Sequence, residues 1–148
     1  MQIGAGMAVR GCGRMELILE APSAADYISL RLRSGMGEKD RARSRTALEN
    51  SLFTASIYDG DVLVAFGRVV GDGGITYVVS DIMVDEACRR RGLADHIMRA
   101  IDRYLTLHTH ADSYICLIAN HPADCLYHKY RFSYLSDDKC GMLRDQSQ

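Results

Sequence analysis

Apolar positions along the chain change their spacing, and the change separates helical stretches from strands. Large aliphatic side chains recur at every fourth position from Leu93 to Leu105, which predicts an amphipathic helix over residues 93–107. Residues 75–84 (ITYVVSDIMV) are almost entirely apolar, as expected of a central strand that is covered on both faces. The clearest pattern in the chain is therefore a buried strand followed, after a short loop, by a long helix.

The other stretches complete a pattern of strands and helices that predicts one α/β domain with a mixed sheet over residues 15–148. The expected strands are residues 15–20, 53–58, 62–70, 75–84, 114–118, 132–135 and 141–143. The expected helices are residues 23–35, 40–50, 93–107 and 123–130. Residues 1–14 are glycine-rich and without period, which indicates a mobile leader with Met7 and Met15 as alternative starts to Met1.

Capping and turn residues place several of these boundaries. Ser23 followed by Asp26 is a capping-box-like start for the first helix, and Gly35 is a natural stop for it. The tripeptide Asp59-Gly60-Asp61 lies between two β-rich stretches and predicts a hairpin.

Composition and charge exclude several classes of protein. Of the 148 residues, 47% are apolar and 25% are charged, which is ordinary for a globular domain and argues against disorder. Eighteen Lys and Arg stand against 19 Asp and Glu, so no overall positive field is available to attract nucleic acid or an anionic membrane. No apolar run approaches the ~20 residues of a membrane span.

The cysteines and histidines add no metal or disulfide framework. Five cysteines form an odd set without a CxxC pair, and no signal-like segment begins the chain. We therefore expect reduced thiols in a cytoplasmic protein. His108 and His110 have no third ligand at a useful spacing, so no metal site is expected.

The segment from Asp81 to Ala94 (DIMVDEACRRRGLA) joins the buried strand to the long helix and is the main candidate for chemistry. Arg89, Gly92 and Ala94 fit the pattern Arg/Gln-x-x-Gly-x-Gly/Ala. Such a turn directs backbone N–H groups and a positive helix end towards one point, which suits a pyrophosphate. A basic turn before a helix is also common on protein surfaces without any ligand, and the residues of this turn alone do not decide between the two interpretations.

A second motif makes the chain resemble the GNAT superfamily of N-acetyltransferases. The turn from Arg89 to Ala94 resembles the family's coenzyme A motif, and residues 119–132 (ANHPADCLYHKYRF) resemble its Asn-x(n)-Tyr-x-Lys-x-Gly-Phe region. Arg131 stands where the family has glycine, so the turn before Phe132 is expected to be distorted. The resemblance covers residues 15–143. It implies a mostly antiparallel central sheet with a splayed parallel pair, flanked by the four expected helices.

The resemblance implies acetyl-CoA as the cosubstrate, with no metal, and assigns residues to it. The end of the buried strand would pair its backbone with the pantetheine arm, and the following turn would surround the pyrophosphate. Asn120 would hydrogen-bond the arm, and Lys129 or alternatively His128 would reach the adenosine phosphates. The cofactor-binding residues that the resemblance implies are Met83, Val84, Arg89, Arg90, Arg91, Gly92, Leu93, Ala94, Asn120 and Lys129.

Two residues are candidates for catalysis. Tyr127 occupies the family's tyrosine position, which implies that it protonates the departing thiolate; the alternative is a core aromatic. Asp81 lies within an apolar strand, where a lone charge costs several kcal/mol unless it is solvated or paired. It either holds or deprotonates the substrate ammonium, or it is a structural partner for an arginine such as Arg68.

The activity that the resemblance implies is acetyl transfer from acetyl-CoA to a primary amine of a small molecule or peptide N-terminus, by direct attack. Residues 71–84 and Gly141-Met142 are also similar to the aralkylamine acetyltransferases. The alternative is a non-catalytic coenzyme A-binding regulatory module on the same fold, since a fold does not establish activity. The sequence does not identify the amine. Exposed strands in such a fold often support dimers, so a homodimer is one possible arrangement.

Overall fold

The computed structural model describes residues 14–147, and in it one five-stranded mixed sheet organises the chain. The strands are β1 (Met15–Ile18), β2 (Phe53–Asp59), β3 (Val62–Gly71), β4 (Thr76–Val84) and β5 (Tyr114–Cys116), in the spatial order β1-β2-β3-β4-β5. Neighbours from β1 to β4 are antiparallel, whereas β4 and β5 are parallel. The predicted fold class is confirmed. The leader expected at residues 1–14, with Met1 and Met7, lies outside the described residues except for Arg14.

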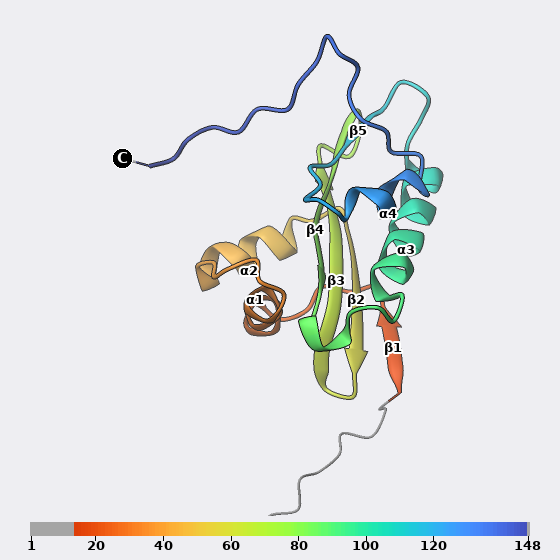
Figure 1. The fold of residues 1–148 in the computed structure, drawn as a ribbon. Coiled ribbons are helices and arrows are strands. Elements are labelled where there is room, and N and C mark those ends of the chain that lie inside the picture. Colours follow the sequence, from red (N-terminus) through yellow and green to blue (C-terminus); the bar gives the residue numbers. More distant parts are fainter. Residues whose placement is uncertain (1–13, 148) are drawn as a thin grey trace, which may run out of the picture.

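Helices cover both faces of this sheet (Figure 1). They are α1 (Ala24–Arg33), α2 (Arg41–Glu49), α3 (Leu93–His108) and α4 (Asp124–His128), with a 3₁₀ turn at Glu86–Cys88. Figure 1 shows α1 and α2 on one face and α3 and α4 on the other. The expected N-cap of α1 is present, because the Asp26 N–H donates to the Ser23 hydroxyl at 3.1 Å. In the part of the chain that the structure describes, no helix is both long and apolar enough to cross a bilayer.

Each face of the sheet has its own apolar core. The four-residue period of α3 buries Leu93, Ile97, Ile101 and Leu105 against the sheet, and this is the larger cluster. The smaller cluster lies under α1 and α2, and its buried residues are Tyr27, Leu30, Leu48, Leu63, Phe66 and Met83. Gly67 allows α3 to approach β3 closely, because a Cβ there would lie 2.5 Å from the Ile97 side chain.

A β-bulge bends β4 near its end. Phe66 pairs with Met83 and Arg68 pairs with Ser80, so Asp81 and Ile82 together stand opposite the single residue Gly67. Asp81 takes the left-handed conformation with φ +55°. A bulge of this kind bends its strand and increases the local twist.

The C-terminal segment corrects the sequence-based prediction. Residues 132–135 and 141–143, which were expected to be strands, form no strand, and β5 ends at Cys116 instead of residue 118. Residues 133–147 are exposed and run away from the sheet (Figure 1). A β-rich sequence becomes a strand only when a neighbouring strand accepts its hydrogen bonds, and the three-residue β5 offers a short edge.

Candidate active site

The end of β4 carries an unpaired backbone edge. Parallel pairing with β5 stops at Val78 and Cys116, so the rest of β4 has β3 as its partner on one side only. The Asp85 N–H donates to the Val64 carbonyl of β3 at 2.8 Å. Because N–H groups of a strand alternate between its two edges, those of Val84 and Ile82 point away from β3. This edge can pair with an extended amide-bearing ligand.

Met83 does not share this edge. The same alternation directs its backbone towards β3, where it pairs with Phe66. Its side chain is 1% exposed and belongs to the core under α1. Ile82, which the sequence analysis did not single out, has the outward-facing N–H instead.

The turn after β4 is shaped by two left-handed residues. The Asp85 carboxylate accepts the Ala87 N–H at 2.9 Å and also pairs with Arg33, which anchors the start of the turn. Arg90 and Gly92 then have φ +63° and +75°, and the chain reverses into α3. Glycine adopts a positive φ without steric strain, which explains why the motif has glycine at position 92.

The N-terminus of α3 is left uncapped. Gly92 has no side chain to accept a hydrogen bond, and the first helical bond runs from the His96 N–H to the Gly92 carbonyl at 3.1 Å. Within residues 14–147 the N–H groups of Leu93 and Ala94 therefore have no acceptor. A Cβ placed on Gly92 would meet nothing within 4 Å, so open space adjoins these donors. An anion placed there would meet free N–H groups and the positive end of the helix.

The three arginines of the turn differ in what they contact. Arg89 donates to the Ser34 carbonyl at the end of α1 at 3.1 Å and lies 3.8 Å from Glu86. Arg90 and Arg91 are exposed, and neither has an ion-pair partner among the described residues. Arg89 thus ties the turn to α1, whereas Arg90 and Arg91 leave their charge available at the uncapped helix.

Asp95 is an acidic group in the first turn of α3, and Tyr130 holds it. The Tyr130 hydroxyl donates to the Asp95 carboxylate at 2.6 Å. This hydrogen bond is the main cause that lowers the pKa of Asp95, and the positive charges of Arg99 and Lys129 lower it further. The tie joins the end of α4 to the start of α3. Lys129, the expected phosphate ligand, is exposed at the C-terminal end of α4.

Tyr127 projects from α4 into the larger apolar core. It is 8% exposed, and its ring lies edge-to-face with Phe132 at a centroid distance of 6.4 Å. Burial raises the pKa of its hydroxyl, so the phenol stays protonated at neutral pH. The same core contains Leu93 and has Val84 packed against it, so Tyr127 shares a cluster with both halves of the candidate site.

Asp81 is surrounded by donors. Its carboxylate accepts hydrogen bonds from the Tyr27 hydroxyl at 2.7 Å, from Arg31 at 3.1 Å and from Arg68 at 2.8 Å. The pairing with Arg68, one of the two alternatives from the sequence, is therefore confirmed. Tyr27 and Arg31 were missed, although an arginine one turn after a buried tyrosine on the apolar stripe of α1 was a usable signal.

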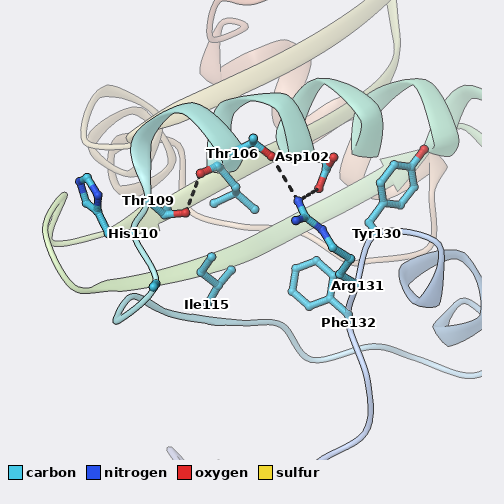
Figure 2. A pocket seen from close by; sticks show the side chains of 10 residues that line it. Asp102, Thr106, Thr109, His110, Ile115, Tyr130, Arg131 and Phe132 are labelled. Carbon is cyan, nitrogen blue, oxygen red and sulfur yellow. Dashed lines mark hydrogen bonds and ion pairs between the residues drawn. The ribbon is translucent and has the colours of Figure 1, made fainter.

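The turn at Arg131 is kept despite the missing glycine. Arg131 adopts φ +68°, the conformation that a glycine would take without strain. Its guanidinium donates to Asp102 at 3.1 Å and to the Thr106 hydroxyl at 3.2 Å, both on α3 (Figure 2). The backbone therefore takes a left-handed conformation that glycine favours, and side-chain bonds to α3 accompany it.

Asn120 lies in the loop between β5 and α4. It is exposed, and its backbone carbonyl accepts the Ala123 N–H at 2.8 Å just before α4 begins. Its side-chain amide has no hydrogen-bond partner within the described part of the chain. The loop follows β5, whose parallel pairing with β4 ends at Cys116, so the exposed amide lies in the segment that leaves the sheet where these strands part.

Comparisons with known proteins agree with this arrangement. The profile of the acetyltransferase (GNAT) family matches residues 16–132. A probable acetyltransferase of meticillin-resistant Staphylococcus aureus is 35% identical, with a TM-score of 0.84, and the match covers 89% of this chain and 99% of that one. A GNAT-family acetyltransferase of Streptococcus pneumoniae is 24% identical, with a TM-score of 0.71 over 91% and 100% of the two chains.

More distant structures share the fold alone. An aminoglycoside N-acetyltransferase in complex with coenzyme A is 15% identical, with a TM-score of 0.65 over 95% of this chain and 100% of that one. A search of functionally curated proteins found no match. The family profile spans most of this chain, and the S. aureus protein matches this chain over nearly the whole length of both proteins. The chain therefore belongs to the GNAT family of acetyltransferases.

Proposed function

We propose that the protein is an acetyl-CoA-dependent N-acetyltransferase that acts on a primary amine of a small molecule or a peptide N-terminus. Membership of the GNAT family supports acetyl transfer in general. The observation that carries the proposal is the continuity of two features: the unpaired edge of β4 at Ile82 and Val84 leads through one short turn to the uncapped N-terminus of α3 at Leu93. One ligand could therefore pair its amides with the edge of β4 and place an anionic group at the N-terminus of α3.

Acetyl-CoA supplies the activated acetyl thioester, and residues of this chain suit its parts. The edge N–H groups of Ile82 and Val84 match a pantetheine arm that adds to the sheet like a further strand. Met83 supports this edge from the core instead of touching the arm. Asn120 lies beyond the splay of β4 and β5 and is proposed to hydrogen-bond the arm from the other side.

The pyrophosphate is assigned to the turn before α3. The free N–H groups of Leu93 and Ala94 and the space beside Gly92 form the cradle, and Arg90 and Arg91 add charge. Arg89 is proposed to fix the turn through Ser34 and to offer its remaining donors to the pyrophosphate. Lys129 is proposed to bind the adenosine phosphates, with His128 as the alternative.

The reaction needs a polarised carbonyl and two proton transfers. The amine nitrogen bonds to the acetyl carbon, the carbon–sulfur bond breaks, the nitrogen loses one proton and the sulfur gains one. A backbone N–H near Val84 that is not paired with the arm is proposed to stabilise the negative charge that develops on the thioester oxygen. The protonated hydroxyl of Tyr127 is proposed to donate to the sulfur.

The proton of the amine is assigned to solvent. A base role for Asp81 has less support, because three donors already occupy its carboxylate and its side chain is 10% exposed. A group so placed is better suited to hold structure than to exchange protons with a substrate.

The test is an assay of free thiol with acetyl-CoA and a panel of amines, including polyamines, aminoglycosides, aralkylamines and peptides, with mass analysis of each amine. We expect thiol and N-acetylated amine to appear in equal amounts with at least one amine class. Tight binding of acetyl-CoA without thiol release in the presence of any amine would instead support the regulatory coenzyme A-binding module.

A further inference from the structure

We propose that Tyr27, Arg31, Arg68 and Asp81, the bulge cluster, form a positioning device that holds the bend of β4. Through that bend they set the direction of the Ile82 and Val84 amides. The inference rests on the proposed function, because those amides belong to the strand edge that is assigned to the pantetheine arm of acetyl-CoA. It assigns Asp81 to positioning and not to the substrate amine.

The bulge requires an unfavourable backbone conformation that the cluster compensates. Asp81 has φ +55°, a region that residues other than glycine rarely adopt, although aspartate tolerates it better than most. Its carboxylate meets one hydroxyl and two guanidinium groups in a nearly closed site, with side-chain exposures of 10% for Asp81, 7% for Arg31 and 16% for Arg68. A carboxylate bound by several charged donors keeps one orientation, and so does the backbone that bears it.

The cluster also joins the bulge to the helices of the opposite layer. Arg31 donates to the carbonyls of Met36 at 2.7 Å and Gly37 at 3.0 Å, just after α1. Arg68 donates to the Ala47 carbonyl and the Ser51 hydroxyl, both at 3.3 Å, at the end of α2. One carboxylate thus links α1, α2, β3 and β4, and the bend of β4 cannot shift unless several of these bonds break.

The position of the cluster determines what its loss would change. Because N–H groups alternate along a strand, a slip by one residue exchanges the amides that face β3 for those that face the free edge. The bulge lies immediately before Ile82 and Val84, whereas the pyrophosphate turn lies beyond Asp85 and has its own anchors. Loss of the cluster should therefore disturb the thioester end of the site more than the phosphate end.

The experiment compares the wild type with Asp81→Asn and Tyr27→Phe. Asparagine keeps the tolerance for a left-handed backbone but loses the charge, and phenylalanine loses the hydroxyl while its ring still packs against Phe66. Asp102→Asn is the matched control, because Asp102 pairs with Arg131 on α3 and belongs to no part of the proposed site. The readouts are the NMR resonances of the Ile82 and Val84 amides, hydrogen exchange of the Met83 amide, whose backbone pairs with β3, coenzyme A affinity, and kcat against pH.

Relative to the wild type, we expect shifted Ile82 and Val84 resonances and faster exchange of the Met83 amide in both cluster variants, and neither change in Asp102→Asn. For Asp81→Asn, kcat should fall by about 10- to 100-fold, the effect of a small misplacement, while coenzyme A affinity stays within a few-fold. The pH profile should keep its shape. Tyr27→Phe should change kcat in the same direction by a smaller factor.

Two results would overturn the proposal. Unchanged amide exchange and kcat in both cluster variants, with a loss of thermal stability alone, would make the cluster merely structural. Loss of the acidic limb of the pH profile in Asp81→Asn, with Tyr27→Phe fully active, would make Asp81 the base. If Asp81→Asn does not fold, Tyr27→Phe decides alone. The exchange data need no turnover, so they decide this proposal even if the wild type transfers no acetyl group.

Discussion

At the scale of single residues, polar side chains hold backbone conformations that the sequence alone makes improbable. Arg131 and Asp81 both lie in the left-handed region, and each is fixed by hydrogen bonds to residues far away in sequence. Hydrogen bonds of the side chain offset the energy of such a conformation, so an arginine can occupy a left-handed position. Substitutions at these positions separate the effect of backbone strain on stability from the effect of the side-chain hydrogen bonds.

Arg131→Ala and Arg131→Gly should differ in stability although both remove the guanidinium. Alanine loses the bonds to α3 and keeps the left-handed strain, whereas glycine loses the bonds and relieves the strain. Since such strain costs on the order of 1 kcal/mol, the glycine variant should be more stable than the alanine variant by about that amount. Urea unfolding measures the difference. Equal stability of the two variants would show that the turn relaxes in the alanine variant.

Tyr127→Phe should lower kcat while the fold survives, because the ring keeps its place against Phe132. A buried phenol is a weak acid, and a thiol has a pKa of about 8.5, so the proton transfer runs uphill. The loss should therefore lie at or below the lower end of general acid catalysis, about 10- to 100-fold. Steady-state kinetics with the best amine measure it. A folded variant with more than half of the wild-type kcat would return Tyr127 to the role of a core aromatic.

At the scale of elements, the site is built where regular structure ends. The edge of β4 lies free because β5 stops, and the N–H groups of α3 lie free because glycine precedes them. Backbone groups left without partners inside a fold are costly, so ends of this kind are natural places for a ligand.

Gly92→Ala should weaken coenzyme A binding by about tenfold or more, since a single misplaced group at a close backbone contact costs at least one hydrogen bond to a charged partner. Gly60→Ala is the matched control: Gly60 has φ +59°, open space around it, and a place in the β2–β3 hairpin far along the chain from the turn. Both variants should lose similar stability. Isothermal calorimetry with coenzyme A measures the affinity, and equal affinity in the two folded variants would remove the turn from the site.

Tyr130→Phe should destabilise the protein more at pH 7 than at low pH. The Tyr130 hydrogen bond lowers the pKa of Asp95, so its stabilisation is present above the usual aspartate pKa of 3.8 and is lost as the pH falls through the lowered value. Melting temperatures of the wild type and the variant should therefore converge below pH 3.8. A difference in Tm that stays constant down to acid-denaturing conditions would mean that the hydrogen bond from Tyr130 to the Asp95 carboxylate contributes nothing to stability.

At the scale of the whole molecule, the sequence predicted what periodicity and local motifs encode. The helix at Leu93–His108, the strand at Thr76–Val84 and the turn between them follow from spacing and glycine chemistry. Of the bulge cluster, the sequence offered only the pairing of Asp81 with Arg68, because Asp81 lies 50 residues from Arg31 and only the tertiary fold brings these two together. The strands expected at residues 132–135 and 141–143 failed for a related reason, since strand formation depends on a partner edge and not on composition alone.

The arrangement of the layers makes the two sides of β4 different. The turn before α3, which is the proposed acetyl-CoA site, lies on one side, and the layer of α1 and α2 lies on the other (Figure 1). Direct transfer requires both substrates to be bound at once, with no acetyl group resting on the protein.

Initial velocities of thiol release, measured over a grid of acetyl-CoA and amine concentrations, test direct transfer most plainly. We expect double-reciprocal lines that intersect, and no thiol release when the amine is left out. Parallel lines, or a burst of thiol equal to the amount of protein in the absence of amine, would show a covalent acetyl-enzyme and contradict direct attack.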